Sequence, residues 1–431
     1  MGFFSAIVRS FKSFRRYNQI LRVFVRYGFE DIVSSMISTG SFRWFRMFIP
    51  RTTRKRAKLH TKWEKMRLVC EELGPTFVKF GQILSNRSDL LPQELVEEFS
   101  KLQDNVPPFS GVIARKSLET ELNKSVDVLF VKFDVEPFAS ASMAQVHKAV
   151  LKNGDKVAVK IQRPGIREVI IEDIRVMYSL AAILEKRIPS SKAFDPKGLV
   201  KHFEESIFKE LDFIHESINL QRFHANIEND KNEVGVTCPK VYQEFTTKQV
   251  LTMQFVNGIK ISSYDLLEEA GHDRKVIANK LAVSYIKQVF EYGFFHADLH
   301  PGNILVLPNS ELCFLDFGLM GSIIPRDIEM FGRLFVSVKN KDVRKIIRAL
   351  QQMSGAIAIK DMRALEYEIN EFVNNYSVQS VHKNEMSTVL MELHEIINRH
   401  GLNVTSHFFL LARSMVTVEG VIHNLDPELD L

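Results

Sequence analysis

Apolar and polar side chains alternate in some parts of this chain and recur at helical spacing in others, which predicts its strands and helices. Over residues 143–151 the two kinds largely alternate, as in a half-buried strand. The pair Asn153-Gly154 follows, a strong signal for a tight hairpin turn into the run 156–161. A small sheet is therefore expected here, followed by helices over about 166–227 and a mainly helical region after residue 256.

A second hairpin is predicted further along the chain. Residues 303–307 form an apolar run, residues 308–310 read Pro-Asn-Ser as in a turn, and residues 312–315 form a returning apolar run. A hairpin of this kind returns the chain to its starting point, so the polar residues at its two ends are expected to lie close together.

The residues at the ends of this hairpin have the spacing of a protein-kinase catalytic centre. Residues 296–318 read HADLHPGNILVLPNSELCFLDFG, which places Asp298, Asn303 and Asp316 as in H-R-D-x-x-x-x-N followed by D-F-G, with Ala297 in place of the Arg. In that motif one carboxylate accepts the proton of the attacking hydroxyl, and the Asn and second Asp hold Mg²⁺ on the phosphates. A D-F-G alone also arises by chance, but the whole constellation favours catalysis over a structural role.

A strand lysine that holds the nucleotide phosphates is also expected in such a centre. Residues 156–161 read KVAVKI, close to the V-A-I-K pattern, which makes Lys160 the candidate. The alternative is an ordinary exposed lysine on a strand. A glycine-rich loop should precede this hairpin, but residues 137–145 read PFASASMAQ. Alanine does not reach positive φ angles without cost, so the nucleotide is expected to sit differently than in an ordinary kinase.

Together these motifs resemble the UbiB/AarF-type atypical kinases, which support ubiquinone and related isoprenoid-lipid synthesis. The resemblance covers roughly residues 66–425, and it depends on motifs that occur in the family's order. They are the K-x-G-Q motif at 79–82, the alanine-rich loop at 139–142, E-x-D-x-x-x-E at 210–216 and H-x-D-x-H-P-G-N at 296–303.

The resemblance implies an α+β, bilobal protein-kinase-like fold with a helical N-terminal extension, and it implies ATP and Mg as cofactors. Asp298 would be catalytic, Lys160 would pair with Glu216, and Asn303 and Asp316 would bind the metal. The nucleotide would also contact the alanine-rich loop and a hinge whose backbone meets the adenine. These cofactor-binding residues are Ala139, Ser140, Ala141 and Ser142 in the loop, and Met253, Gln254, Phe255 and Val256 in the hinge.

In the family the K-x-G-Q extension lies across the place where a protein kinase takes its peptide, which disfavours phosphorylation of other proteins. The resemblance implies that Lys79 pairs with Glu210 or Asp212 and that Gln82 points into that pocket. Asp212 and Glu216 are four residues apart, which would place both carboxylates on one helix face. A Glu-Asp-Glu set of this kind is otherwise typical of a solvated helix face.

The sequence departs from the family pattern in two places, the alanine-rich loop and the C-terminal end. Ser140 stands where the loop usually has Ala, and Ala144 stands where a Gly commonly precedes the Gln, so nucleotide preference is open. Bacterial relatives are also expected to continue past Leu425-Asp426-Pro427 into an apolar membrane hairpin, whereas this sequence stops at Leu431. Either the sequence is shortened or this member binds membranes by other means.

Four regions are predicted along the chain. Residues 1–65 form a basic extension, residues 66–135 the helical K-x-G-Q extension, residues 136–255 a kinase-like small lobe with a helical insertion, and residues 256–431 a helical large lobe. The 431 residues, 45% of them hydrophobic, are enough for sizeable cores. The three cysteines, Cys70, Cys238 and Cys313, have no disulfide or metal spacing, and the histidines form no zinc set.

Charge is distributed unevenly. Residues 1–70 contain 16 Lys and Arg but only three acidic residues, whereas the whole chain has a net charge of +5. Apolar residues recur at helical spacing near the start, interleaved with basic ones, as in a helix on an anionic membrane surface. The alternative is an amphipathic helix packed on its own core. The apolar stripe is Phe3, Phe4, Ile7, Val8, Phe11 and Phe14, with Arg9, Lys12, Arg15 and Arg16, and a second basic cluster is Arg51, Arg54, Lys55, Arg56 and Lys58.

Together with the basic N-terminal region, the resemblance implies a membrane-associated atypical kinase or ATPase that binds Mg-ATP and supports isoprenoid quinone synthesis by ATP-driven handling of lipid intermediates. Its expected location is peripheral, at the cytoplasmic face of a bacterial inner membrane, with a mitochondrial location as the alternative. Its expected partners are an anionic membrane, isoprenoid quinone intermediates and quinone-synthesis enzymes. No nucleic acid is expected, because no nucleic-acid-binding motif accompanies the basic residues. The alternative functions are a small-molecule or lipid kinase and a nucleotide-gated lipid-binding scaffold with little turnover.

Overall fold

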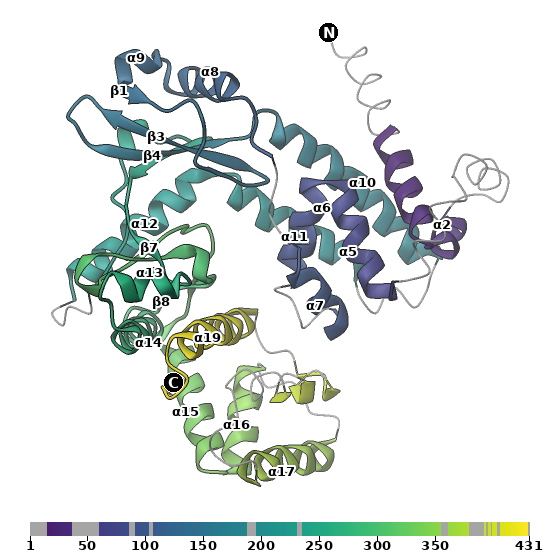
Figure 1. Ribbon diagram of the computed structural model, residues 1–431. Helices are drawn as coiled ribbons and strands as arrows, with labels where there is room; N and C mark the ends of the chain where they lie inside the picture. The colour runs from purple at the N-terminus through teal and green to yellow at the C-terminus, as the bar shows by residue number, and fades with distance from the viewer. Residues whose placement is uncertain are drawn as a thin grey trace. The chain divides into compact units, whose positions relative to one another are not determined.

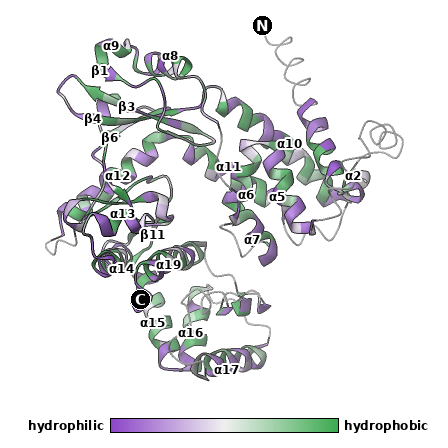
Figure 2. Cartoon of the chain, viewed as in Figure 1, coloured by the Kyte–Doolittle hydropathy of each residue, from purple (hydrophilic) through white to green (hydrophobic). Residues whose placement is uncertain are grey.

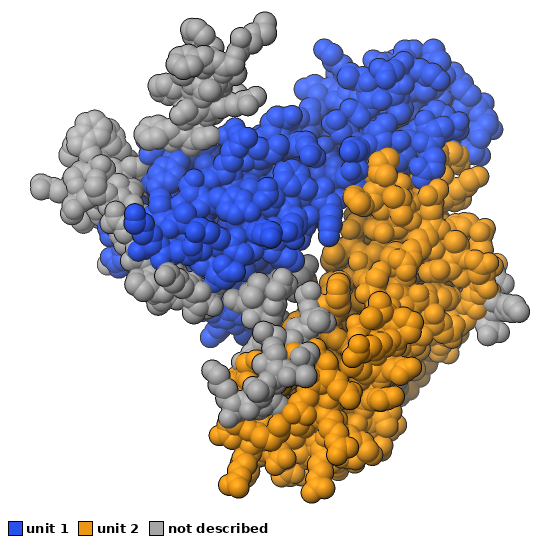
Figure 3. Space-filling view, turned by 180° about the vertical axis from the view of Figure 1, so that it is seen from behind, with its two compact units in different colours: residues 1–213, 243–252 blue, residues 214–242, 253–431 orange. Residues whose placement is uncertain are grey.

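The computed structural model describes residues 15–36, 60–85, 91–102, 107–187, 195–230, 235–354, 361–378, 392–393, 395–397, 399–402 and 406–429 (Figure 1). The chain packs into two compact units, coloured separately in Figure 3. The first contains residues 1–213 and 243–252, and the second contains residues 214–242 and 253–431. The predicted membrane stripe at residues 3–14 and the basic cluster at residues 51–58 lie outside the described residues.

The first unit contains the predicted sheet. Its strands run in the order β1-β3-β4-β6, and β2 pairs with β3. The predicted hairpin is confirmed, because β3 and β4 are antiparallel and Val146 lies opposite Lys160. Continuous burial of β4 from Val157 to Val159 explains its unbroken apolar run. The strands are β1 Phe130–Phe133, β2 Ala139–Ser140, β3 Ala144–Leu151, β4 Lys156–Gln162 and β6 Val250–Gln254.

Helices make up the rest of the first unit. The N-terminal residues 15–36, the K-x-G-Q helices and two later helices share one hydrophobic core, in which Ile20, Phe77, Ile170 and Phe203 are buried. The helices are α2 Glu30–Met36, α5 Lys62–Leu73, α6 Pro75–Ser85, α7 Gln93–Ser100, α8 Gly111–Leu122, α9 Val126–Leu129, α10 Ile166–Arg187 and α11 Pro196–Glu210. Along α10, hydrophobic and hydrophilic residues are interleaved, as expected for a helix with one buried face (Figure 2).

The described part of the N-terminal region packs on the protein's own core. Ile20 and Val25 are fully buried, and the Arg16 guanidinium forms an ion pair with Asp173 of α10 at 2.6 Å. Arg16 also donates to the Leu73 carbonyl at the end of α5. For these residues the structure therefore agrees with the alternative in which an amphipathic helix serves a core.

The sheet begins earlier than predicted. β1 lies inside the region 66–135 that the sequence indicated as a helical extension, and Phe130 of this strand pairs with Leu151 of β3. Helix α8 belongs to the same layer, because Glu121 accepts hydrogen bonds from Thr247 and Gln249 next to β6. The strand is only four residues long, too short for alternation to distinguish it from a helix.

The second unit contains the predicted second hairpin. β9 and β10 pair antiparallel across a 3₁₀ turn at Pro308–Ser310, within a sheet ordered β5-β10-β9-β7. A separate pair joins β8 to β11, with His296 opposite Met320. The strands are β5 Val236–Thr237, β7 Ile259–Lys260, β8 Phe294–His296, β9 Ile304–Val306, β10 Leu312–Phe314 and β11 Met320–Ser322. Cys313 is buried in β10 as expected, and burial raises the pKa of its thiol.

Helix α14 packs against α19, β8 and β10 of the second unit. The helices of this unit are α12 Phe213–Glu228, α13 Tyr264–Glu269, α14 Arg274–Phe290, α15 Pro325–Lys339, α16 Val343–Met353, α17 Met362–Val378 and α19 Ser406–Leu425. Among the described helices of the chain, none combines the length and the apolar character needed to cross a bilayer.

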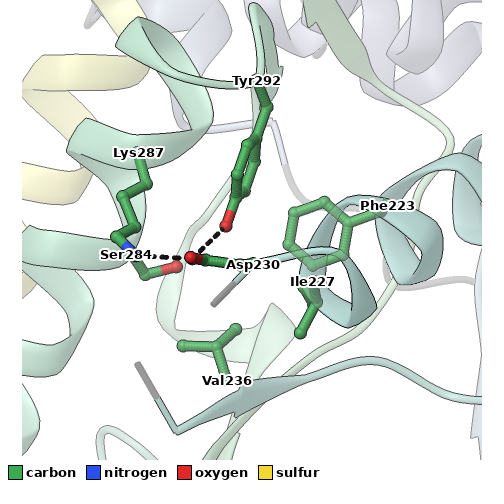
Figure 4. A pocket seen from close by; sticks show the side chains of 7 residues that line it. All are labelled: Phe223, Ile227, Asp230, Val236, Ser284, Lys287 and Tyr292. Carbon is green, nitrogen blue, oxygen red and sulfur yellow. Dashed lines mark hydrogen bonds and ion pairs between the residues drawn. The ribbon is translucent and has the colours of Figure 1, made fainter. Parts of the chain in front are cut away.

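Helix α12 belongs with the second unit from Ile214 onward, although the sequence placed it in the small lobe. Its far end is tied to α14 by a buried cluster, shown in Figure 4. Asp230 accepts from Lys287 at 2.5 Å and from the Tyr292 hydroxyl at 2.7 Å beside a cavity of about 20 Å³. Removing Lys287 would leave the Asp230 carboxylate without its countercharge, so this cluster holds the end of α12 to α14.

Candidate catalytic site

His296 connects the two halves of the predicted catalytic motif. Its buried ring donates from Nε2 to the carbonyl of Leu315 at 3.0 Å and accepts from the Asp298 main-chain N–H at Nδ1 at 3.2 Å. Burial lowers the pKa of His296 below its ordinary value. The ring therefore stays neutral, with one nitrogen that donates a hydrogen bond and one that accepts. The histidine thereby fixes the backbone before Asp298 and the backbone before Asp316 at the same time.

Asn303 makes the second connection between these segments. Its Nδ2 donates to the Asp298 carbonyl at 3.0 Å, and its own carbonyl accepts from the Leu315 N–H at 2.8 Å. This use of the amide nitrogen leaves Oδ1 as the atom that is able to bind a cation. The structure therefore brings Asp298, Asn303 and Asp316 together, as the spacing predicted.

Asp316 has an unusual backbone conformation. Its φ is +52°, in the left-handed region, which Asp tolerates better than most residues but which is still uncommon. The carboxylate accepts from the Gly318 N–H at 3.2 Å, and a Cβ at Gly318 would lie 3.1 Å from that oxygen. Conformations of this kind cluster at functional sites, where the surrounding structure maintains them.

Phe317 holds this turn in place. Its ring is fully buried, with its centroid 5.2 Å from that of His296 and 5.0 Å from that of Phe223 on α12. Asn219, one turn earlier on α12, donates to the Phe317 carbonyl at 2.9 Å. Helix α12 therefore supports the D-F-G segment from within the same unit. Sequence reasoning missed Asn219, because an Asn on a helix carries no distinguishing signal.

The donor set fits a hard divalent cation. Asn303 and Asp316 offer oxygen atoms, and no group of three or more His, Cys, Asp or Glu suited to a metal occurs among the described residues. Mg²⁺ is commonly held in this way, by one or two side-chain oxygens together with substrate phosphates, rather than by a complete protein cage. The residues present therefore fit a magnesium ion that arrives with a nucleotide.

Lys160 and Glu216 lie in different units. Lys160 is half-buried at the middle of β4, with its Nζ 5.3 Å from the centroid of the Phe213 ring, while Glu216 is buried on α12. Their predicted ion pair stays a prediction.

The alanine-rich loop keeps a tight turn without glycine. Ala139 and Ser140 pair with β3, and the Ala141 N–H donates to the Ala144 carbonyl at 2.8 Å. The structure describes this loop throughout, and no residue in it has a positive φ. Alanine and serine therefore fit the loop without strain, which explains how the chain dispenses with the missing glycines. Ser142 is fully buried.

Buried polar residues under this loop were missed in the sequence. Gln145 accepts from the Phe109 N–H and donates to Nε2 of His147, whose Nδ1 donates to the Asp134 carbonyl. Arg163 donates to the carbonyls of Ser142 and Pro107. The sequence did contain a signal for the two strand residues, because every second residue of a strand faces the same side. Positions 145 and 147 therefore share a strand face with the buried Ala149 and Leu151.

Lys79 pairs with Glu210, one of its two predicted partners. Its Nζ lies 2.5 Å from Glu210 Oε1, and the Asp212 carboxylate lies 3.8 Å from Lys248 Nζ. Asp212 is also not on the helix face of Glu216, contrary to the prediction, because it lies in the break between α11 and α12. There Gln162 donates to the Leu211 carbonyl, and the Phe213 N–H donates to the Lys248 carbonyl, so the sheet edge interrupts the helix.

Gly81 and Gln82 pack α6 against the segment after α7. A Cβ at Gly81 would lie 2.3 Å from Leu102 and 3.3 Å from the Phe99 ring, so only glycine fits without a shift. Gln82 Nε2 donates to the Leu102 carbonyl at 3.1 Å. The predicted pointing of Gln82 into a substrate pocket stays a prediction, but its amide nitrogen has this partner inside the extension.

One backbone group of the predicted hinge, the Gln254 N–H, already has a hydrogen-bond partner within the protein. The Gln254 N–H donates to the Lys240 carbonyl at 2.8 Å, and Met253 forms a bridge with Val241. The Gln254 N–H is therefore already used by the protein, and an adenine contact would have to involve other backbone groups between Met253 and Val256. Gly258 follows, where a Cβ would lie 2.9 Å from the Val306 carbonyl oxygen.

Comparisons with known proteins identify the family of this chain. The ABC1 atypical kinase-like domain family matches residues 101–350, and the UbiB helical domain family matches residues 369–430. A relative from Synechocystis, named only as uncharacterized protein sll1770, is 36% identical over 87% of this chain, which spans 63% of that relative's length. The probable protein kinase UbiB of Pseudomonas fluorescens is 32% identical over 97% of this chain and 78% of that protein.

The fold is shown by a solved structure as well. Rv3197 of Mycobacterium tuberculosis, in complex with erythromycin, has a TM-score of 0.57 and 23% identity, covering 83% of this chain and 90% of that one. The predicted α+β, protein-kinase-like fold is confirmed. Since the ABC1 match covers the alanine-rich loop, the strand lysine and the His296–Asp316 centre, and the UbiB match covers the helices that follow, the chain belongs to the UbiB-type ABC1 atypical kinase-like family.

Proposed function

We propose that this protein is an ATP- and Mg²⁺-dependent atypical kinase or ATPase, and that it acts at an anionic membrane in support of isoprenoid quinone synthesis. The observation that carries the catalytic part is the double connection from His296 and Asn303, which holds the segments of Asp298 and Asp316 in one arrangement. Preorganised polar groups of this kind are what phosphoryl transfer requires of a protein, because little covalent chemistry is left to it.

In the proposed reaction Asp298 acts as the proton acceptor. The oxygen of water or of an acceptor hydroxyl forms a bond to the γ-phosphorus, the bond from that phosphorus to the bridging oxygen breaks, and its electron pair leaves with ADP. The proton of the attacking oxygen passes to the Asp298 carboxylate. Lys160 contributes positive charge at the phosphates, and Glu216 orients it.

Asn303 and Asp316 would hold the metal through their side-chain oxygens. The ion would neutralise the phosphate charge that develops as the γ-phosphoryl group leaves. The positive φ of Asp316 presents its carboxylate in one direction, and the hydrogen bonds of Asn303 do the same for its Oδ1.

The membrane and lipid part of the proposal has separate support. Relatives named as probable protein kinase UbiB match 97% of this chain, and the family resemblance connects such proteins to ubiquinone synthesis. The basic first 70 residues, with 16 Lys and Arg, suit an anionic lipid surface. The proposed location is the cytoplasmic face of a bacterial inner membrane, with a mitochondrial location as the alternative, and the proposed partners are quinone intermediates and the enzymes that process them.

The test is phosphate release from Mg-ATP by the purified chain, with and without liposomes of anionic lipid, beside the variant Asp316→Asn. We expect liposome-stimulated release that the variant loses, together with the loss of the thermal stabilisation that Mg-ATP gives the parent protein. Asp265→Asn, at an exposed position on α13, is the matched control and should behave as the parent. Unchanged Mg-ATP stabilisation of Asp316→Asn would contradict the metal assignment.

The same experiment separates the alternatives. A stable phosphorylated lipid or small molecule in place of free phosphate would show a kinase. Tight ATP binding without release, with or without lipid, would show a nucleotide-gated scaffold.

A further inference from the structure

Helix α14 has polar side chains on its buried face. They are Ser284, Tyr285, Lys287 and Gln288. Lys287 pairs with Asp230 just past the end of α12, and the Tyr285 hydroxyl is hydrogen-bonded to that of Ser414 on α19, so these two residues hold helices together. Gln288 has a different partner, because its amide reaches the strand that leads into the catalytic loop.

Gln288 holds the main chain of His296. Its carbonyl oxygen, Oε1, accepts from the His296 N–H at 2.9 Å. Strand β8 forms a two-stranded sheet with β11, and on that side the next residue, Ala297, donates to the Leu319 carbonyl. Successive N–H groups of a strand point to opposite sides, so the His296 N–H points away from β11. Gln288 therefore takes the place of a neighbouring strand at the last residue of β8.

Ser284 fixes which end of the Gln288 amide faces the strand. Gln288 Nε2 donates to the Ser284 hydroxyl at 3.3 Å, one turn earlier on the same helix. Because an amide has one acceptor end and one donor end, this bond leaves Oε1 turned towards His296. Ser284 itself is placed beside Asp230 and Lys287, since all three line the same cavity (Figure 4).

A buried glutamine is an unfavourable way to fill a helix face. Leu or Met would pack in the same space without losing hydration, whereas the fully buried Gln288 amide must be desolvated and paired at both ends. Such hydrogen bonds add little net stability, but they hold a neighbour in one geometry. The geometry held here is that of His296, whose ring fixes the backbone before Asp298 and before Asp316.

We propose that Gln288 is a positioning residue of the catalytic loop, which acts through His296 on Asp298. This inference rests on the proposed function. Gln288 anchors the His296 main chain, and the His296 ring accepts from the Asp298 N–H at 3.2 Å, so the carboxylate that takes the proton of the attacking oxygen stays in place. Gln288, buried behind the strand, would contact neither the nucleotide nor the metal.

The first test compares Gln288→Met, Gln288→Glu and the parent protein in Mg-ATP turnover. Met has the length of Gln but no acceptor, so we expect kcat to fall about 10-fold while KM for ATP stays within about twofold. A buried Glu is favoured in its neutral form, which accepts at one oxygen and donates at the other, so Gln288→Glu should recover most of the lost kcat. A rise in KM with kcat unchanged, or a Glu variant no better than the Met variant, would overturn the proposal.

Tyr285→Phe is the matched control for lost stability. This neighbour on the same buried face loses its hydrogen bond to Ser414, while its ring keeps the edge contact with Phe295. Both Tyr285→Phe and Gln288→Met should unfold at a lower temperature than the parent, because each leaves a buried polar group with one partner fewer. Only Gln288→Met should lose kcat when both are assayed well below their unfolding midpoints. An equal loss of kcat in Tyr285→Phe would make Gln288 merely structural and overturn the proposal.

Hydrogen exchange tests the positioning without turnover. In the protein without nucleotide, the His296 and Asp298 amides should exchange about 10-fold faster in Gln288→Met than in the parent, since the first loses its acceptor and the second is held less firmly. Tyr285→Phe should leave both amides protected. Unchanged exchange in Gln288→Met would overturn the proposal. Absence of phosphate release or transfer by the parent protein, with the faster exchange present, would instead refute the proposed function and leave the positioning role standing.

Discussion

Nε2 of His296 donates to the carbonyl of Leu315 across 3.0 Å, and this bond joins the end of β8, just before the catalytic loop, to the residue between β10 and Asp316. The ring is fully buried between Phe314 and Phe317, and its other nitrogen, Nδ1, accepts a hydrogen bond from the Asp298 N–H. Stability and catalysis therefore depend on the same side chain here, and both are expected to fail together when it is removed.

Replacement of His296 by Leu should test this dependence. The change leaves the Leu315 carbonyl and the Asp298 N–H buried without partners, which costs about 1–3 kcal/mol for each group. We expect the free energy of unfolding in urea to fall by about 2–4 kcal/mol and kcat for Mg-ATP to fall in parallel. His423→Leu, at an exposed site on α19, should change neither quantity appreciably. Full activity of His296→Leu would show that the bond to Leu315 is dispensable.

Asn219 should control the D-F-G turn from α12. In Asn219→Ala the Phe317 carbonyl loses its donor, so we expect a loss of about 1 kcal/mol in stability and a weaker hold on Asp316. Kinetic titration with Mg²⁺ should show a higher concentration for half-maximal activity. Asn229→Ala is the matched control just past the same helix, where the side chain donates to the local Ala225 carbonyl. Equal Mg²⁺ dependence of both variants would remove Asn219 from the site.

Gly81 and Gly332 should respond to alanine with opposite signs. A Cβ at Gly81 meets Leu102 at 2.3 Å, so Gly81→Ala is expected to destabilise the first unit by about 1–3 kcal/mol through overpacking. A Cβ at Gly332 on α15 meets nothing within 4 Å, and alanine is the better helix former, so Gly332→Ala should stabilise by about 0.5–1 kcal/mol. Chemical denaturation of the two variants measures both effects, and a stabilising Gly81→Ala would contradict the close packing of α6.

Lys79 and Glu210 should be energetically coupled. In a double-mutant cycle with Lys79→Met and Glu210→Gln we expect a coupling of about 0.5–1 kcal/mol, because the pair is close but partly exposed. The cycle of Lys248→Met with Asp212→Asn is the control and should give almost none, since Lys248 is 77% exposed and its nitrogen is 3.8 Å from the carboxylate. A larger coupling for Lys79 with Asp212 than with Glu210 would show that the partner has been misidentified.

Stability should fall on mild acidification because His147 is buried. Burial lowers the pKa of His147 in the folded protein below the ordinary value of about 6.5 that it has when unfolded. As the pH falls through that value, the unfolded chain takes up a proton that the native protein refuses, so stability present at pH 7 is lost towards pH 5. Each such histidine contributes at most about 1.4 kcal/mol per pH unit. His147→Gln should reduce the slope of unfolding free energy against pH, and an unchanged slope would contradict this.

The sequence by itself was sufficient to predict the structures that residues close together in the chain form. The hairpin of β3 and β4 follows from alternation and Asn153-Gly154, and the hairpin of β9 and β10 follows from two apolar runs around a turn. The spacing from Asp298 to Asp316 follows as well, since a short hairpin must return the chain to the same place. In each case the contacts that matter lie a few residues apart, within reach of what periodicity and turn chemistry encode.

Only the tertiary structure decided the relationships between distant segments. The helix predicted through Asp212 and Glu216 is interrupted because Gln162 of β4 and Lys248, just before β6, form hydrogen bonds with its backbone groups. Helix α12 joins the second unit because Asn219 bonds to Phe317 and Asp230 to Lys287. Helix α19 is brought onto α14 and β11, which lie far from it in the sequence. A single sequence specifies local propensity directly, but such long-range pairings depend on which buried surfaces and polar groups fit one another after the chain has folded.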